Sequence, residues 1–248
     1  MPIITLLTDF GIADSYVAEV KGVLLSCAPD ATLIDVTHLV PRGDVGAAQY
    51  LLSRAWRRFP EGTTHFAVVD PGVGSSRRAI AAHHAAHRFV APDNGLLSFL
   101  PRDARFVALA EPANAAPTFH GRDLFAPAAA ALASGVSLES VGRRIDDPVH
   151  SPLPTPRMHS DSIIGEIIYV DHFGNLISNV SGTDVQPTAR VWLGGRDLGL
   201  LRRTFADVAP DDALAYVGSG GTVEIAVRDG NAAQQLEAGV GAELRMEA

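Results

Sequence analysis

The sequence predicts an α/β protein in which an N-terminal α/β domain with a mostly parallel sheet precedes a smaller C-terminal all-β barrel domain. Short apolar runs alternate with amphipathic or Ala-rich stretches from Ile3 to about Gly142, a pattern typical of strands interleaved with helices. A polar stretch with prolines at positions 148, 152, 154 and 156 follows, and it disfavours helix and central strand. Short β-type runs separated by Gly, Asn and Asp then indicate a small barrel or sandwich. We therefore place the domains at residues 1–150 and 163–248, with a Pro-rich linker at 151–162.

The elements of the N-terminal domain are bounded by turn-forming residues. Pro29-Asp30 ends the first helix, and clusters beginning at Asp70 and at Pro92 end two strands. The predicted elements are the strand Ile3–Leu7, the helix Ser15–Ser26, the strand Leu33–Val36, the helix Val45–Phe59, the strands Phe66–Val69, Ala79–Ala82 and Phe89–Ala91, and a last helix, Phe125–Ala133.

The C-terminal domain contains six apolar runs short enough to be strands. They are Ile163–Val170, Leu176–Val180, Ala189–Leu193, Ala213–Val217, Thr222–Val227 and Ala242–Met246.

Composition limits the classes of function. The 248 residues are 47% hydrophobic, which is enough for a buried core, and the net charge of −8 argues against a nucleic-acid-binding surface. The first residues have no basic segment before an apolar run, and the apolar stretches are too short to span a membrane. The lone Cys27 cannot form an internal disulfide, and its apolar surroundings predict a buried, inert thiol. We expect a cytoplasmic protein that does not contact membranes.

Three polar segments lie where an α/β sheet binds ligands, beyond the carboxyl ends of strands. Thr8 to Gly11 follows the first strand, Asp70 to Arg77 follows a central one, and Phe119 to Asp123 precedes the Ala-rich helix. These segments predict a polar site at one edge of the sheet.

The residues of these segments differ in how strongly they indicate function. Asp9 could cap a turn or bind a ligand, and the sequence leaves both open. Asp70 ends a strand and is held by a Pro-Gly turn, which favours a functional carboxylate. Alternation along the next strand would send either Arg77 or Arg78 inward, without deciding which. His120 lies in a polar turn, which favours a functional imidazole.

Nine histidines raise the question of a metal site. Three of them, His83, His84 and His87, fall in a predicted surface hairpin, where we expect them to be solvated. Cys27 is the only cysteine, so no Cys pair is present. A hard-metal centre built from Asp9, Asp70, His120 and Asp123 stays open as a minor alternative, but we expect no metal and no cofactor.

Several of these segments, in order along the chain, resemble those of the S-adenosyl-L-methionine hydrolases, also called hydroxide adenosyltransferases, which are relatives of the fluorinase and chlorinase. The segments are TDFG at 8–11, DVTH at 35–38, VVDPGVG at 68–74 with Arg77-Arg78, APDNG at 91–95, FHGRDLFAP at 119–127 and YVDHFGNLISNV at 169–180. The resemblance implies hydrolysis of S-adenosyl-L-methionine to adenosine and L-methionine by attack of an activated water at the ribose C5′. It also implies a homotrimer in which the ligand lies between the N-terminal domain of one subunit and the C-terminal domain of its neighbour.

The resemblance also implies roles for individual residues. The water-activating set would be Asp70, Arg77 and His120, and this selects Arg77 over Arg78. Whether Asp70 or His120 finally takes the proton stays open. The implied substrate-binding residues are Asp9 on the ribose hydroxyls, Phe173 and Asn175 on the adenosine, and Ser219, Glu224 and Val227 lining the remainder.

Two other functions remain as alternatives. The fluorinase carries Tyr and a halide-binding Ser where this chain has His120 and Gly121, and another Tyr where this chain has Asp70. A carboxylate repels a halide but can accept a proton from water, so hydrolysis is preferred to halogenation. A non-catalytic adenosine or S-adenosyl-L-methionine sensor would need Asp9 and Asn175, but it would have little use for Asp70, Arg77 and His120 together.

Overall fold

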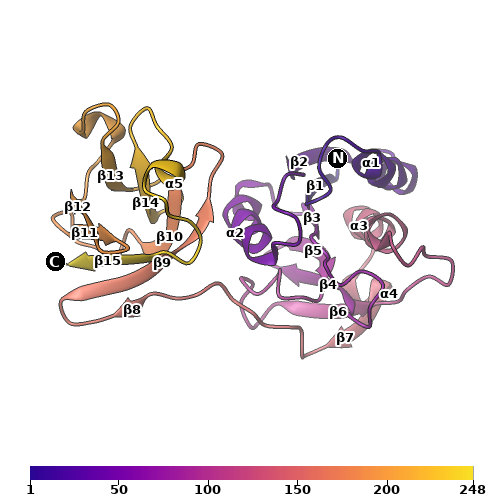
Figure 1. Cartoon of the computed structure of the whole chain (residues 1–248). Helices are drawn as coiled ribbons and strands as arrows, with labels where there is room; N and C mark the ends of the chain where they lie inside the picture. The colour runs from indigo at the N-terminus through magenta and orange to yellow at the C-terminus, as the bar shows by residue number, and fades with distance from the viewer. Residues whose placement is uncertain (248) are drawn as a thin grey trace. The chain divides into compact units, whose positions relative to one another are not determined.

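The computed structural model describes residues 1–247. They form two compact units, which meet in sequence between Pro152 and Leu153 (Figure 1). The domain and linker limits inferred above, 1–150, 151–162 and 163–248, stay predictions.

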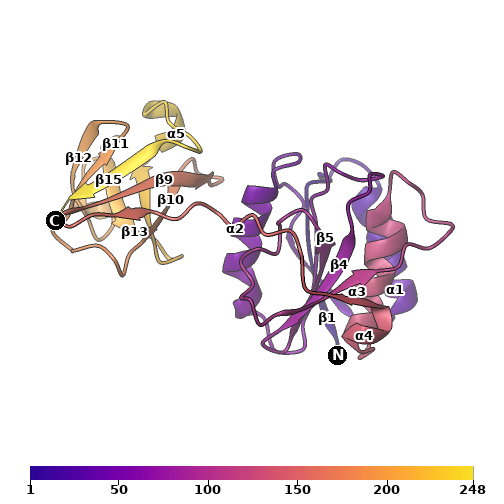
Figure 2. The ribbon, with the colours of Figure 1, turned by 90° about the horizontal axis from the view of Figure 1, so that it is seen from below.

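The first unit has three layers, with helices on both faces of a seven-stranded sheet. Figure 2 shows α2 on one face of the sheet and α1, α3 and α4 on the other. The elements are β1 (Ile3–Thr8), α1 (Tyr16–Cys27), β2 (Thr32–Thr37), α2 (Val45–Ala55) with a 3-10 turn η1 (Trp56–Arg58), β3 (Thr64–Val68), β4 (Ala79–His84), β5 (His87–Pro92), β6 (Arg105–Leu109), the π-helical turn η2 (Gly121–Phe125), α3 (Ala126–Ala133), α4 (Leu138–Val141) and β7 (Gly142–Ile145).

The sheet is mixed rather than mostly parallel, so that part of the prediction is wrong. Its strand order is β2-β1-β3-β5-β4-β6-β7. The pairings among β2, β1, β3 and β5 are parallel, whereas those among β5, β4, β6 and β7 are antiparallel. Only Ala85 and Ala86 separate β4 from β5, with φ of 47° and 61°. A two-residue turn can join only antiparallel strands, and positive φ at both positions gives it the matching twist.

Three further elements were absent from the sequence prediction. These are β6, β7 and α4, so α3 is not the last helix of this unit. β6 and β7 extend the antiparallel half of the sheet, where β6 pairs with β4 and β7 pairs with β6.

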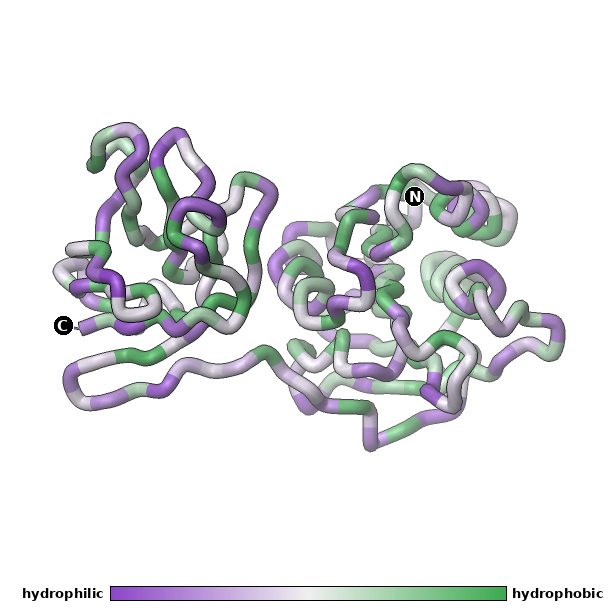
Figure 3. Tube along the Cα trace, in the orientation of Figure 1, coloured by the Kyte–Doolittle hydropathy of each residue, from purple (hydrophilic) through white to green (hydrophobic). Residues whose placement is uncertain are grey.

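The core of the first unit lies between the sheet and α1 and α3. Leu6, Phe66 and Phe125 are completely buried there, and the small Ala129 and Ala130 let α3 pack close to the sheet. Figure 3 shows hydrophobic colour along the central strands β1, β3 and β5. Cys27, expected to be buried, is exposed. It is the last residue of α1, and the following Ala28 packs into the core instead.

The second unit is an antiparallel sheet that nearly closes on itself. Its order is β12-β11-β15-β9-β10-β14-β13, with β8 paired to β9. An isolated β-bridge joins Arg202, which follows β12, to Tyr216 in β13, and so links the two ends of this strand order. The predicted barrel-like all-β arrangement is therefore confirmed in outline, with two short helical segments and two strands that the sequence did not predict. The elements are β8 (Arg157–Met158), β9 (Ser162–Val170), β10 (Leu176–Ser181), β11 (Arg190–Leu193), β12 (Arg196–Leu200), the 3-10 turn η3 (Phe205–Asp207), β13 (Ala213–Val217), β14 (Thr222–Val227), α5 (Ala232–Gln235) and β15 (Glu243–Glu247).

Within residues 1–247, no helix has both the length and the apolar character needed to cross a bilayer.

Candidate active site

The parallel strands of the first unit bring polar side chains to one edge of the sheet. Asp9 follows β1, Asp70 follows β3 after one residue, and His38 follows β2. Because β1 pairs in parallel with both β2 and β3, the carboxyl ends of all three strands lie at the same edge.

Asp70 and Arg77 form a buried ion pair beyond the end of β3. Arg77 Nε lies 3.0 Å from each Asp70 carboxylate oxygen, and Arg77 Nη2 also donates to Oδ2. The two side chains are only 6% and 11% exposed, for Asp70 and Arg77 respectively. Desolvation makes a buried ion pair a poor source of stability, so this arrangement is better explained by chemistry than by folding.

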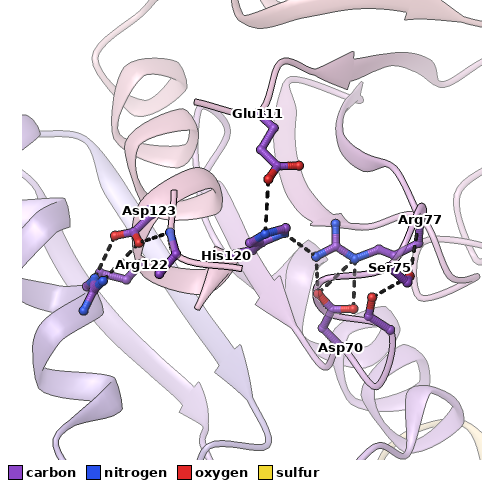
Figure 4. Close-up of polar contacts among 9 residues, drawn as sticks. Asp70, Ser75, Arg77, Glu111, His120, Arg122 and Asp123 are labelled. Atoms are coloured by element: carbon purple, nitrogen blue, oxygen red, sulfur yellow. Dashed lines mark hydrogen bonds and ion pairs between the residues drawn. The ribbon is translucent and has the colours of Figure 1, made fainter. Parts of the chain in front are cut away.

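His120 extends this pair into a chain. Arg77 Nη2 lies 3.0 Å from His120 Nδ1, and the imidazole is 3% exposed. The Arg77 guanidinium also lies over the ring of Phe125, 5.2 Å from its centroid. Figure 4 shows Asp70, Arg77 and His120 joined in series. The structure thus brings the three predicted catalytic residues together, while their roles stay a prediction.

The contact with Arg77 determines the tautomer of neutral His120. A guanidinium only donates hydrogen bonds, so Nδ1 must be the acceptor and carry the lone pair. The proton of the neutral ring then sits on Nε2, a buried atom with no hydrogen-bond partner in residues 1–247. Neutral His120 therefore has no free lone pair, and Asp70 is the remaining candidate acceptor of a proton.

Local geometry explains why this loop approaches the Asp70 turn. A side chain at Gly121, the first residue of η2, would crowd Phe10, because a Cβ there would lie 3.0 Å from Phe10 Cζ. Gly74, with φ of +76°, lies so close to the His120 loop that a Cβ would be 2.9 Å from the carbonyl oxygen of Pro117. Single π-helical turns such as η2 occur often at functional sites.

Asp9 is held at the same edge of the sheet by the loop after β2. Its Oδ2 accepts a hydrogen bond of 2.8 Å from the Gly43 N–H. Gly43 in turn lies against Pro71, the neighbour of Asp70, since a Cβ on Gly43 would be 3.7 Å from Pro71 Cβ. The carboxylate of Asp9 therefore fixes a loop beside the Asp70 turn, while its role in binding a ligand stays a prediction.

Polar contacts link the DVTH segment at 35–38 to Thr8, the residue before Asp9. Thr8 Oγ1 lies 2.8 Å from His38 Nδ1, and His38 Nε2 lies 3.1 Å from Asp35 Oδ1. Lys21 Nζ lies 2.7 Å from Asp35 Oδ2. Burial alone would raise the pKa of Asp35, but hydrogen bonds from Lys21 and His38 outweigh it and hold that pKa below its usual value. This chain fastens the backbone that carries Asp9.

Arg78 points away from the predicted catalytic set. Its Nε donates to Asp93 at 2.7 Å and its Nη1 to Asp147 at 2.8 Å. Val149 N–H also donates to Asp93, at 2.7 Å. Arg78 thus fastens the segment before the end of this unit, whereas Arg77 reaches the site.

Asp123 anchors a loop. Arg122 and the Ala116 N–H both donate to its carboxylate, and these hydrogen bonds, that of Arg122 foremost, hold the pKa of Asp123 below its usual value. Among residues 1–247, no three His, Cys, Asp or Glu side chains are arranged to hold a metal ion. The set of Asp9, Asp70, His120 and Asp123 considered from the sequence is therefore not gathered as a ligand cluster.

The predicted substrate-binding residues of the second unit line one hollow of about 770 Å³, which contains Phe173, Asn175, Ser219, Glu224 and Val227. Phe173 is 73% exposed, so its ring face is open to a ligand. Asp171 accepts hydrogen bonds from the backbone and side chain of Asn175, which pins the amide in the turn. The structure brings these five residues together, and their contacts with a ligand stay a prediction.

Several residues near the two sets were not singled out from the sequence. In the hollow, Tyr216 donates to Glu224 Oε2 at 2.8 Å, and Asp171 and Phe205 also line it. In the first unit, Glu111 Oε1 lies 3.5 Å from His120 Nε2. The alternation of β13 could have indicated Tyr216, but no sequence signal pointed to Glu111, because the strand before it was not recognised.

Family models match most of the chain. Residues 4–142 match the SAM hydroxide adenosyltransferase N-terminal domain, and residues 165–245 match the corresponding C-terminal domain.

Individual proteins agree with these matches. An "(R)-S-adenosyl-L-methionine hydrolase" from Salinispora tropica is 41% identical over 257 residues, covering 100% of this chain and 98% of the relative. A "Fluorinase" from Nocardia brasiliensis is 30% identical, covering 99% of this chain and 97% of the relative. The crystal structure of an uncharacterized conserved protein from Thermotoga maritima superposes with a TM-score of 0.92 at 35% identity, covering 99% of this chain and 100% of that one.

Proposed function

Because the chain belongs to the SAM hydroxide adenosyltransferase family, we propose that it hydrolyses S-adenosyl-L-methionine to adenosine and L-methionine. The observation that carries this proposal is the buried series of Asp70, Arg77 and His120 at the carboxyl edge of the parallel strands. A binding protein would gain little from burying an ion pair next to an imidazole, whereas an enzyme that activates water needs a charged acceptor held in place.

The proposed reaction is an in-line displacement at the ribose C5′. The water oxygen forms a bond to C5′ while the C5′–S bond breaks, and the electron pair of the broken bond stays on sulfur. Methionine then leaves as a neutral thioether, so departure needs no acid, metal or cofactor. The difficulty lies in making and aiming the nucleophile.

Asp70 is the proposed acceptor of the water proton. The hydrogen bond from Arg77 occupies the Nδ1 lone pair of His120, so the neutral ring has no free lone pair with which to take the proton of the water. A carboxylate has four lone-pair positions and can accept a further hydrogen bond while paired with Arg77. The proton passes from Asp70 to solvent after adenosine has formed.

The proposed binding roles divide between the two sets of residues. Asp9 accepts hydrogen bonds from the ribose hydroxyls, using oxygen positions that Gly43 does not occupy. Phe173 stacks on the adenine, Asn175 hydrogen-bonds the adenosine, and Ser219, Glu224 and Val227 line the rest of the pocket. In this proposal, binding one molecule of substrate requires residues of the first unit and residues of the second unit.

Water is the proposed nucleophile because of two positions near the catalytic set. Asp70 would repel a halide, and Gly121 cannot accept the serine that binds halide in the fluorinase without displacing Phe10, 3.0 Å from the added Cβ.

The test is incubation of the purified protein with S-adenosyl-L-methionine, with and without excess fluoride or chloride, followed by chromatography. We expect adenosine and methionine in every sample, unaffected by chelator, with the (R) epimer named by the relatives consumed. A 5′-halogenated adenosine would establish the halogenase, and intact substrate would establish a sensor.

The proposed assembly is a homotrimer in which neighbouring subunits share each ligand. Apolar side chains exposed near each set support it: Ile12 and Leu39 beside the Asp9 loop are 75% and 65% exposed, and Phe173 is 73% exposed. Exposed apolar groups concentrated at a site indicate an interaction surface.

Subunit mixing tests this assembly. Asp70→Asn and Asn175→Ala variants should each be nearly inactive alone, and co-refolding them should restore about a quarter of the wild-type activity, because some sites combine two intact halves. Light scattering should give three chains per particle. Activity that does not rise above the sum of the separate variants would contradict sharing between subunits.

A further inference from the structure

Glu111 reaches the catalytic set through the antiparallel half of the sheet. Ile80 in β4 pairs with Ala108 in β6. Extending this register by three residues on each strand, past the start of β4 and the end of β6, places Glu111 opposite Arg77. The pairing of β4 with β6 therefore delivers a carboxylate to the neighbourhood of the buried Arg77.

The carboxylate of Glu111 lies beside Nε2 of His120, the imidazole that contacts Arg77. His120 Nε2 is buried and without a hydrogen-bond partner in the described residues, and Glu111 Oε1 is 3.5 Å away from it. Figure 4 shows the carboxylate directed at the imidazole, opposite Arg77. A buried N–H without an acceptor is costly, so an acceptor is expected on this side of the ring.

The same loop is tethered at several points, which limits where Glu111 can go. β6 ends two residues before it, and Asp123 accepts the Ala116 N–H at 2.9 Å. Pro117 in this loop also contacts Gly74 in the Asp70 turn. A shift of a few tenths of an ångström would bring Glu111 to ordinary hydrogen-bond distance from Nε2.

We propose that Glu111 is a positioning residue for the hydrolysis: its carboxylate accepts the Nε2–H of His120 and holds the ring with Nδ1 toward Arg77. This proposal rests on the proposed function. The imidazole is then clamped between a donor, Arg77, and an acceptor, Glu111, and the clamp keeps Arg77 aimed at Asp70. The arrangement resembles the way a carboxylate orients the histidine of other catalytic sets.

Kinetics of three variants test the proposal. Glu111→Ala removes the acceptor, whereas Glu111→Gln keeps an acceptor oxygen without its charge. Glu139→Ala is the control, because the carboxylates of Glu111 and Glu139 are both 58% exposed and each faces a basic side chain of the same unit. We expect Glu111→Ala to lower kcat about tenfold with KM within about twofold, Glu111→Gln to recover most of the loss, and the control to match the wild type. A kcat of Glu111→Ala equal to that of the control, or a loss confined to KM, would overturn the proposal.

A measurement without substrate separates this proposal from the proposed function. Nitrogen-15 NMR of the ligand-free protein, with the His120 signal assigned from a His120→Gln sample, reports the tautomer and the rate at which the Nε2–H exchanges with water. We expect Nε2 protonated in the wild type and exchange at least about fivefold faster in Glu111→Ala than in Glu139→Ala. Equal exchange rates would refute the contact even in an active hydrolase, and faster exchange would uphold it even if the substrate were another.

Discussion

Asp70→Asn is expected to lower kcat for S-adenosyl-L-methionine hydrolysis by about 100-fold or more, with the dissociation constant of the substrate changed by less than about threefold. The amide keeps the shape of the side chain but cannot accept the proton of water, and it replaces the charged partner of Arg77. Steady-state kinetics give kcat, and calorimetry with substrate gives the affinity.

Asp147→Asn is the matched control for this prediction. Asp147 also accepts from an arginine, Arg78, but it is 80% exposed and lies outside the catalytic set. We expect its kcat within about twofold of the wild type. An Asp70→Asn enzyme as active as this control would remove Asp70 from the mechanism.

His120→Gln tests which group takes the proton. Glutamine can accept from Arg77 through Oε1 and donate through Nε2, as the proposed tautomer of His120 does. We therefore expect a loss of about tenfold, well below that of Asp70→Asn. The reverse order would make His120 the proton acceptor.

The stability of the first unit is expected to fall steeply below pH 6.5 because of His65. This side chain is completely buried beside Phe89, with Nδ1 2.8 Å from Thr5 Oγ1 and Nε2 3.1 Å from His87 Nδ1. Burial, helped by the neighbouring His87, lowers the pKa of His65 to about 3. The sequence had placed His87 among solvated histidines, yet it is 5% exposed, because the hairpin packs this ring against Trp56.

The direction of this pH dependence follows from the protons that the folded and unfolded chains bind. Below pH 6.5 the unfolded chain protonates His65 while the folded chain does not, so the stabilisation is complete above pH 6.5 and is lost as the pH falls toward 3. Between pH 7 and 4.5 this group alone should remove about 3 kcal/mol from the free energy of unfolding.

Urea unfolding of His65→Leu in a Trp192→Phe background measures this loss, since Trp56 then reports on the first unit alone. The variant should be less stable than the wild type at pH 7, and the difference should shrink by about 3 kcal/mol by pH 4.5. The exposed His150 serves as the control through His150→Gln, which should leave the pH dependence unchanged. A difference between His65→Leu and wild type that is constant with pH would refute the assignment.

Much of the fold followed from local patterns, and the exceptions have a common cause. The buried strands β1 and β3 and the helices α1 and α2 were predicted within a few residues, because each carries an apolar period and a terminating turn. β6 and β7 were missed: both are short, and arginine occupies one position of β6 and two of β7. β6 is held between β4 and β7, and β7 at the edge of the sheet is held by β6, so both are defined by their partners rather than by their own hydrophobicity.

The sequence by itself determined the family, the mixed α and β content, and the residue types of the candidate site, since these depend on motifs and local periodicity. Only the tertiary structure decided that Arg77 pairs with Asp70 while Arg78 turns to Asp93, that Nδ1 of His120 is the acceptor, and that Glu111 stands beside Nε2. The physical reason is that these residues lie in segments between the strands, and these segments come together only when the sheet has formed. Their distances are set by sheet register and close packing, which no local pattern encodes.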